Sequence, residues 1–435
     1  MPPEAHVPKV KPSRIAATRK PPLWQTLGPG LVTGAADDDP SGIATYSQAG
    51  AQFGFRLGWT LLLTFPLMVV IQAISAWLGR TTGHGIAGNL RQHYPRWLLH
   101  GIVTLLFIAN TLNIGADLGA MAEASRLLLP AAPAWLYVLA FGTVCVAGQV
   151  FLPHSRYVAA LKWLTVSLFA YFAAACVVHV PWRDFVQGLL LPRLQFSRDF
   201  WLMVVAILGT TISPYLFFWQ AAQEVEDTKA KPVEQPLLQA PAQGPRAMTR
   251  IRVDTMVGMG ISNVVALAIM VTTAATLNRR GVSTIESAAQ AAEALRPIAG
   301  PAAFALFALG ILGTGLLSVP VLAGSAAYAV GESLQWPVGL ARRPLQAKAF
   351  YVTIALATLL GALANVLHVN PVQALVWVAV LNGIVAVPVM ALLMLMSVRA
   401  DVMGPFRISR GWTIIGWVAT AVMAAASAFF IAASA

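Results

Sequence analysis

Long apolar stretches follow one another along almost the whole chain, separated by short polar segments. A transmembrane helix needs about 20 consecutive apolar residues, and eleven stretches approach or exceed that length. They fall at about 23–54, 57–79, 98–128, 135–152, 157–180, 201–225, 254–277, 301–330, 345–367, 371–397 and 411–433. The pattern predicts an all-α polytopic membrane protein with eleven transmembrane helices.

The first of these stretches is interrupted by charge. Its centre reads GAADDDPSG, so that Asp37, Asp38 and Asp39 directly precede Pro40. Each carboxylate near the middle of a bilayer costs about 2.5–3.5 kcal/mol. Because proline and the nearby Gly42 permit a break in a helix, we expect the first span to be discontinuous here, with acids lining a polar cavity.

The sixth stretch carries a similar interruption. Ser213 and Pro214 lie in its middle, just after Thr210. Corresponding broken helices in two halves of a chain are typical of transporters built from inverted repeats, where they form the ion site. We therefore predict two five-helix repeats and one extra helix, both first spans being broken. The repeats fall at about 23–180 and 201–397, and the extra span at about 411–433.

Composition and charge agree with a membrane protein and set its orientation. Hydrophobic residues make up 57% of the 435 residues and charged residues 11%, against about 25% charged in soluble proteins. With the N-terminus inside, 21 of the 29 Lys and Arg residues fall on the inner side and 8 on the outer side. The positive-inside rule then places the C-terminus outside. The net charge of +12 thus needs no nucleic-acid partner.

Two polar segments lie outside the spans. Residues 1–22 combine six prolines with five basic residues and lack an apolar run, which predicts a disordered cytosolic tail and no cleavable signal peptide. Residues 228–249 are rich in Pro, Gln and Ala and are predicted to form a cytosolic linker. The membrane transporter domain then extends over 23–435, in the inner membrane of a bacterial cell.

Further polar side chains within the spans are candidate ligands. Asp117 and Glu123 lie in the third span among small residues, and Asn382 lies in the tenth. Asp117 is either a ligand or a hydrogen-bonded structural acid. Glu123 either pairs with nearby Arg126 or serves an outer vestibule, and Asn382 is a neutral ligand or marks a kink. No catalytic or cofactor motif is present, so we expect neither an enzyme nor a bound cofactor.

The stretch GPGLVTGAADDDPSGIATY resembles the first span of the Nramp family of divalent-metal transporters, which share a LeuT-type fold. The family signature there is Asp-Pro-Gly-Asn. Asp39 matches the metal-binding aspartate and Pro40 the proline. Gly42 stands in place of the asparagine, so that one side-chain oxygen ligand is lost.

The resemblance continues in the third and sixth spans. The sixth-span signature is Met-Pro-His, and here Ser213, Pro214 and Tyr215 occupy those places. By this resemblance Thr210 supplies a backbone carbonyl to the metal, and Asp117 matches the acidic position of the third span. The ligand methionine and the histidine linked to proton movement are both replaced.

These replacements are similar to the Nramp-related magnesium transporters. A thioether favours soft metals, whereas Mg²⁺ is bound through one or two carboxylates and keeps several waters. We expect a roomier, hydrated site, made of Asp39, Gly42, Thr210, Ser213, Asp117, Glu123 and Asn382. The predicted function is uptake of Mg²⁺, and of Mn²⁺, across the lipid bilayer by a monomer without proton coupling. The alternatives are a proton-coupled Mn²⁺/Fe²⁺ symporter and an amino-acid or organic-solute transporter of the same fold.

Overall fold

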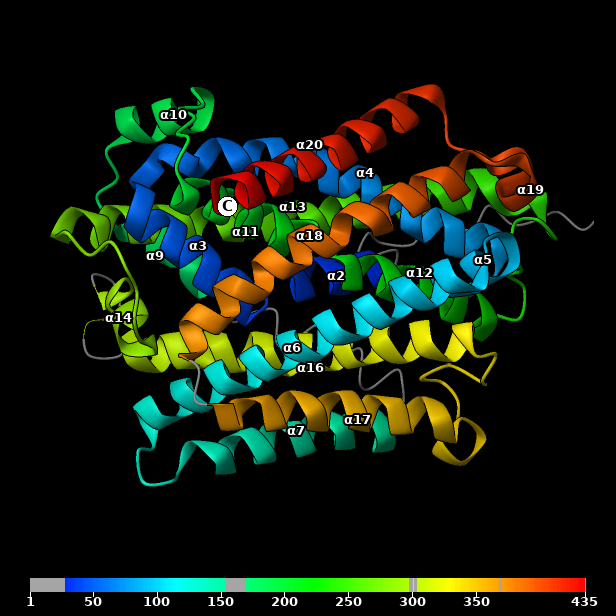
Figure 1. Cartoon of the computed structure of the whole chain (residues 1–435), viewed down its shortest axis with the longest axis horizontal. Helices are drawn as coiled ribbons and strands as arrows, with labels where there is room; N and C mark the ends of the chain where they lie inside the picture. The colour runs from blue at the N-terminus through cyan, green and yellow to red at the C-terminus, as the bar shows by residue number, and fades with distance from the viewer. Residues whose placement is uncertain (1–27, 153–168, 297–299, 301–302, 368–369, 435) are drawn as a thin grey trace, which may run out of the picture.

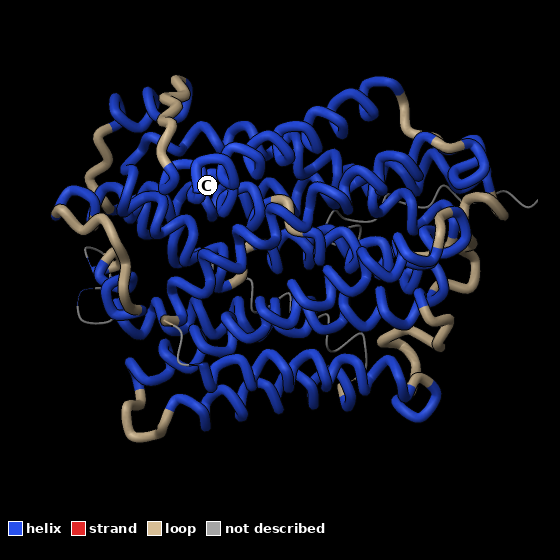
Figure 2. Tube along the Cα trace, in the orientation of Figure 1, coloured by secondary structure: helices blue, strands red, loops and turns tan. Residues whose placement is uncertain are grey.

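The computed structural model describes residues 28–152, 169–296, 300, 303–367 and 370–434. Helices dominate these residues, and within them no β-strand occurs (Figure 2). Eight helical stretches of this part of the chain are long and apolar enough to cross a membrane. The all-α prediction is therefore confirmed.

The helices of the first half of the chain include a short pair that replaces the first span (Figure 1). They are α2 (Pro29–Asp37), α3 (Pro40–Phe53), α4 (Gly58–Thr82), α5 (Ile86–His93), α6 (Arg96–Leu128), α7 (Ala134–Phe151), α9 (Phe169–Val177) and α10 (Trp182–Leu190), with the 3-10 turn η1 (Gly54–Leu57) between α3 and α4. Most of the predicted span at 157–180 and the predicted tail at 1–22 lie outside the described residues.

The second half repeats this order. It consists of α11 (Arg198–Thr211), α12 (Pro214–Ala230), η3 (Pro241–Gln243), α13 (Gly244–Thr276), η4 (Asn278–Arg280), α14 (Ala288–Glu293), α16 (Ala303–Ser333), η6 (Pro344–Gln346), α17 (Lys348–Ala364), η7 (Asn365–Leu367) and α18 (Pro371–Val398). The chain continues with α19 (Ala400–Met403), η8 (Gly404–Phe406) and α20 (Arg410–Ser434). The total of eleven spans remains a prediction, since α17 has only 17 residues and α2 and α3 are short.

Both predicted breaks occur where proline begins a second helix. The backbone is extended at Asp39, with φ −66° and ψ 173°, and at Ser213, with φ −80° and ψ 131°. Pro40 and Pro214 then occupy the first helical position, where a missing N–H costs nothing because that group has no partner inside the helix. The two breaks are thus alike in local structure as well as in place along the repeat.

The helices pack as two groups, and the broken pairs belong to the first of them. In the first group α13 packs on α2, α3 and α4, and α4 packs on α12. In the second, α6, α7, α16 and α17 pack on one another and lie together in the lower part of Figure 1. Helix α18 contacts α3, α6 and α11. Side chains at the breaks therefore lie where the two groups meet.

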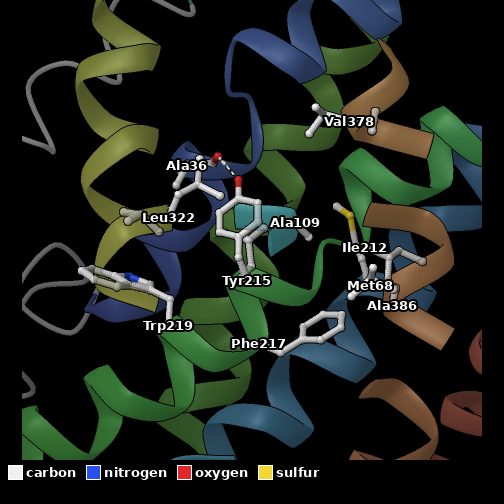
Figure 3. Packing of buried hydrophobic residues seen from close by; sticks show 14 of the residues in the cluster. Ala36, Met68, Ala109, Ile212, Tyr215, Phe217, Trp219, Leu322, Val378 and Ala386 are labelled. Atoms are coloured by element: carbon white, nitrogen blue, oxygen red, sulfur yellow. Dashed lines mark hydrogen bonds between the residues drawn. The ribbon is translucent and has the colours of Figure 1, made fainter. Parts of the chain in front are cut away.

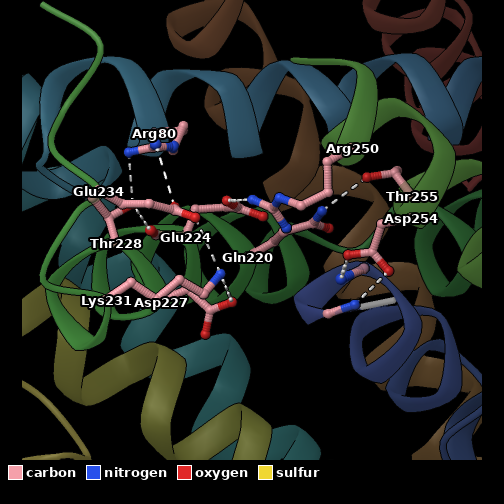
Figure 4. Close-up of polar contacts among 12 residues, drawn as sticks. Arg80, Gln220, Glu224, Asp227, Thr228, Lys231, Glu234, Arg250, Asp254 and Thr255 are labelled. Carbon is pink, nitrogen blue, oxygen red and sulfur yellow. Dashed lines mark hydrogen bonds and ion pairs between the residues drawn. The ribbon is translucent and has the colours of Figure 1, made fainter. Parts of the chain in front are cut away.

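Glycine brings α2 and α13 into backbone contact. A Cβ atom at Gly258 would overlap the carbonyl group of Gly30, and one at Gly34 would overlap the backbone of Gly258. The first turn of α2 is also bound to α13 by a carboxylate. Asp254 accepts the N–H groups of Gly28, Gly30 and Leu31 at 2.9, 2.8 and 3.2 Å (Figure 4). These contacts fix the start of α2 to α13.

The connection between α12 and α13 is shorter than the predicted linker 228–249, because both ends of that range are helical. It is also held by Arg80 of α4, whose side chain is 2% exposed. Arg80 donates to the carbonyl of Gln235 at 2.6 Å and to Oε1 of Gln243 at 2.8 Å. Figure 4 shows the same side chain beside Thr228 and Glu234. The connection is therefore anchored to α4.

The backbone contact between α2 and α13 can be tested by adding one methyl group. We expect Gly258→Ala to destabilise the protein by about 1–3 kcal/mol, as overpacking does in well-packed interiors. The measurement is thermal denaturation of the detergent-purified protein, followed by tryptophan fluorescence. Gly101→Ala on α6 is the matched control, because nothing lies within 4 Å of its Cβ position. Equal melting of both variants would show that the close approach is unimportant.

Candidate functional site

Asp39 lies between the two halves of the first broken span and is 1% exposed. One carboxylate oxygen, Oδ1, accepts the hydroxyl of Ser41 at 2.6 Å and the N–H of Gly42 at 2.7 Å. A carboxylate at this position is an N-cap, which satisfies N–H groups that have no partner within the helix. Helix α3 therefore orients Asp39 and stabilises its charge.

The second oxygen of Asp39, Oδ2, has weaker partners. Nδ2 of Asn113 on α6 and the hydroxyl of Tyr215 on α12 lie 3.4 Å from it, at the long limit for hydrogen bonds. The Tyr215 hydroxyl is closer to the carbonyl of Ala36, at 2.8 Å (Figure 3). Oδ2 therefore lies where side chains of three helices converge and keeps the capacity to bind a cation.

Helix α6 contributes further oxygen atoms one turn apart. Asn113 and Asp117 are four residues apart and so share a face of the helix. Oδ2 of Asp117 accepts the hydroxyl of Ser318 on α16 at 2.8 Å. Oδ1 of Asp117 and Oδ1 of Asn113 are buried without a hydrogen-bond partner among the described residues. Such buried oxygens are costly unless satisfied, and a cation or its water shell would satisfy them.

Two predicted ligands, Thr210 and Ser213, lie at the second break. The hydrogen bonds of the Ser213 side chain are made to the backbone of α11. The hydroxyl of Ser213 donates to the carbonyls of Gly209 at 2.7 Å and Thr210 at 3.0 Å. Both Ser213 and Thr210 are buried. In this conformation the serine therefore closes the end of α11, and the Thr210 carbonyl already accepts one hydrogen bond.

Gly42 supports the site in a way that the sequence did not indicate. Its N–H binds Asp39, and a Cβ atom there would lie 3.1 Å from the carbonyl oxygen of Asp37 and 3.2 Å from Oγ1 of Thr210. The ring of Tyr46 lies 3.4 Å from the same position. The expected extra room beside Gly42 is thus absent in this conformation, because α11 and Tyr46 fill it.

Asp37 and Asp38 point to a different helix from Asp39. Both are fully buried, and both contact the hydroxyl of Ser262 on α13, at 2.6 and 3.2 Å. A single hydroxyl hydrogen serves only one of these contacts at a time. The three consecutive carboxylates are therefore divided between α13 on one side and α6 with α12 on the other.

Two predicted site residues, Glu123 and Asn382, make no hydrogen bond with Asp39. Glu123 accepts the N–H of Ala288 at 3.0 Å, at the beginning of α14. No ion pair joins it to Arg126 among the described residues. Asn382 on α18 is fully buried, and both polar atoms of its amide lack a hydrogen-bond partner within the described part of the chain. Asn382 thus keeps the free oxygen that a neutral ligand needs.

Neutral groups separate the acids of this region. Within the described residues no three His, Cys, Asp or Glu side chains come together as a cluster able to hold a metal ion. Asp39 and Asp117 alternate instead with the amide of Asn113 and the hydroxyls of Ser41, Ser318 and Tyr215. This arrangement of oxygens suits a hard cation that retains part of its water shell.

Cavities lie toward both ends of the molecule. At the end that carries α5, a cavity of about 570 Å³ is lined by α5, α12 and α16, with Glu226, Lys229 and Glu332 among its residues. His84 also lines it, and burial together with the nearby Lys229 lowers the pKa of His84, which keeps it neutral at pH 7. At the end that carries α14, a cavity of about 20 Å³ lies between α3, α6 and α14.

Four contributors to the site were missed in the sequence: Asn113, Tyr215, Ser262 and Ser318. Asn113 could have been found, because it precedes Asp117 by one helical turn. Tyr215 was noted only as a replaced histidine. Ser262 and Ser318 lie on helices whose rotation the sequence pattern does not determine, so no local signal pointed to them.

Comparison with known proteins gives a consistent result. The family model for "Nramp", described as natural resistance-associated macrophage protein-like, matches residues 30–433. Divalent metal cation transporter MntH of Deinococcus radiodurans is 26% identical over 99% of this chain and 95% of its own length. MntH of Acidiphilium cryptum is 28% identical over 94% of this chain and 89% of its own.

Solved structures show the same fold. A mutant of the manganese transporter of Eremococcus coleocola has a TM-score of 0.73 at 17% identity, over 94% of this chain and 87% of that one. The inward-facing conformation of Mhp1 has a TM-score of 0.50 at 15% identity, over 94% of this chain and 88% of that one. The predicted LeuT-type arrangement is thereby confirmed.

The role of Asp39 is directly testable. We expect Asp39→Ala to abolish binding of Mg²⁺ and Mn²⁺, because it removes the carboxylate on which three helices converge. Isothermal titration calorimetry of the purified protein measures binding, and its elution on size exclusion reports folding. Asp199→Ala, at an exposed acid in the first turn of α11, is the control. Normal affinity in well-folded Asp39→Ala protein would exclude Asp39 as a ligand.

Proposed function

Because this chain belongs to the Nramp family and is a multi-pass transporter of divalent metal cations rather than an enzyme, we propose that its main cargo is Mg²⁺. We further propose that Mn²⁺ is accepted and that neither ion needs a proton to cross. The observation that carries this proposal is the set of contacts around Asp39, which consists of oxygen and nitrogen groups from α3, α6 and α12.

The chemistry of these groups favours a hard cation. Mg²⁺ prefers oxygen ligands in octahedral geometry and usually keeps several waters. Carboxylate, amide and hydroxyl oxygens can bind either the ion or those waters. Ser213 stands where the family signature has a methionine, so the soft sulfur that would favour transition metals is absent from that position.

Manganese is the strongest rival as principal cargo. The related structures from Eremococcus coleocola are described as a manganese transporter, and Mn²⁺ shares the oxygen preference of Mg²⁺. Uptake by purified protein in liposomes, with Mg²⁺, Mn²⁺, Ca²⁺ and alanine offered in turn, separates these cargoes. Uptake of Mn²⁺ with no uptake of Mg²⁺ would contradict the proposal, and uptake of alanine would indicate a solute transporter.

The contribution of Ser213 to selectivity can be tested by restoring sulfur. We expect Ser213→Met to shift preference toward Cd²⁺ and Mn²⁺ relative to Mg²⁺ by about tenfold or more, because a thioether binds soft ions better. Competition binding measures the ratio. Ser213→Ala is the matched control, since it also loses the bonds to Gly209 and Thr210 but adds no sulfur. The same ratio in both variants would show that residue 213 does not face the ion.

The groups near Asp39 support the proposal of transport without proton coupling. Tyr215 stands where the family signature has a histidine, and its hydroxyl is bonded to the Ala36 carbonyl. A tyrosine with an ordinary pKa near 10 does not exchange protons at neutral pH. A membrane potential of about 100 mV is worth about 4.6 kcal/mol for a divalent ion. That energy supports over a thousandfold accumulation, so no proton is required.

Proton movement can be followed during Mg²⁺ uptake. In proteoliposomes that contain a pH-sensitive dye, we expect Mg²⁺ uptake without internal acidification when the membrane voltage is clamped. The control is addition of a protonophore, which confirms that the dye responds. Metal-dependent acidification that persists under the clamp and disappears in Asp117→Asn would show that protons accompany the metal through Asp117.

A further inference from the structure

The segment between α13 and α16 crosses the end of the molecule at which α14 lies (Figure 1). Side chains of other helices bind its backbone. Gln48 of α3 donates to the carbonyl of Ser283 at 2.9 Å and accepts the N–H of Ile285 at 2.8 Å. The amide of Asn370, the residue that caps α18, donates to the carbonyl of Glu286 at 2.9 Å. The segment is therefore held to α3 and to the start of α18.

Glu123 of α6 makes the remaining contact of this kind. Its Oε1 accepts the N–H of Ala288 at 3.0 Å. Gln48 and Asn370 are neutral amides, whereas Glu123 is a carboxylate. Hydrogen bonds to charged acceptors are stronger than those between neutral groups. Loss of the Glu123 contact should therefore loosen the segment more than loss of either amide.

The same carboxylate lines the small cavity beneath the segment. That cavity has a volume of about 20 Å³, roughly the space of one water molecule. Ile43, Ser47, Ala120 and Ile285 are among its lining residues, and Glu123 is the charged one. Ser47 is two helical turns from Asp39 on α3, and Glu123 is six residues beyond Asp117 on α6. The cavity thus lies between this segment and the turns of α3 and α6 that lead to Asp39 and Asp117.

We propose that a cation path to Asp39 begins at this cavity, that residues 277–295 form its outer lid, and that Glu123 is the latch of this lid, which an arriving divalent cation releases. The latch itself stands on the contacts just described. Its release by a cation rests on the proposed transport of Mg²⁺ and Mn²⁺.

Competition for one carboxylate explains how the lid would respond to its cargo. Divalent cations bind carboxylate oxygens directly or through water. While Glu123 binds a cation or its water shell, the same oxygen no longer accepts the N–H of Ala288. The neutral contacts of Gln48 and Asn370 have no charge for the cation to compete for, so they keep the lid attached while its α6 side opens. Glu123 is thus a gating residue, and Asp39 remains the ligand of the deeper site.

The latch can be tested with a cysteine beneath the lid. Bacterial cells producing the full chain with Ser47→Cys are treated with a membrane-impermeant maleimide in the absence of divalent cations. Cys176 is exposed and is replaced by serine, whereas Cys145 is buried. We expect labelling to be about tenfold faster with Glu123→Ala than with the native glutamate. Glu123→Gln retains a neutral acceptor for the Ala288 N–H and should label at a rate between those two.

Two controls make this result interpretable. Thr284→Cys, at an exposed lid position, should label rapidly in every background, and failure to do so would contradict an outward-facing lid. Glu293→Gln removes a lid acid that pairs with Arg296 and not with α6, so it should leave Ser47→Cys labelling unchanged. Equal labelling of Glu123→Ala and the native background would overturn the latch.

Release by the cargo is a separate measurement. We expect added Mg²⁺ to accelerate Ser47→Cys labelling in the native background severalfold and to have no such effect with Glu123→Gln, which lacks the charge. Equal acceleration in both would place the action of the cation elsewhere and overturn its release of Glu123. This outcome differs from failure of the proposed function, because the latch in cation-free medium does not depend on which ion is carried.

Discussion

The N-cap interaction of Asp39 with α3 is the contact on which the centre of this molecule depends. A carboxylate far from bulk water is costly unless groups of the protein take the place of its hydration. Here the N–H of Gly42 and the hydroxyl of Ser41 do so. The same bonds cap the beginning of α3 directly after the break, so the charge and the break in the first span stabilise each other.

The second break carries no charged side chain. Its backbone is extended like that of the first break, but different hydrogen bonds stabilise it. Ser213 donates its hydroxyl to the end of α11, whereas Asp39 accepts the N–H of Gly42 at the start of α3. One break therefore concentrates negative charge, and the other leaves neutral carbonyl and hydroxyl oxygens beside it. Together they would offer an ion oxygens of different strength, while only one of the two breaks carries formal charge.

Features that depend on local sequence could be predicted, and those that depend on helix rotation could not. The two breaks follow from proline beside a polar residue, and the spans follow from the length of apolar runs. The partners of Asp37 and Asp38 could not be predicted, because contact with Ser262 requires knowing which face of α13 meets α2. The packing around Gly42 was also hidden, since a missing side chain indicates space only when no neighbour fills it. Arg80 gave no sign that it anchors the α12–α13 connection.

The contacts between α2 and α13 restrict how the protein can change shape. Glycines allow the two backbones to touch, and Asp254 holds the first N–H groups of α2. A movement of α2 alone would break both sets of contacts at once. The two helices should therefore rotate as a single rigid body, and relative motion is left to the surface between the two helix groups, where Asp39 faces α6. Access to the ion would then alternate by rocking of one group against the other rather than by bending of one helix.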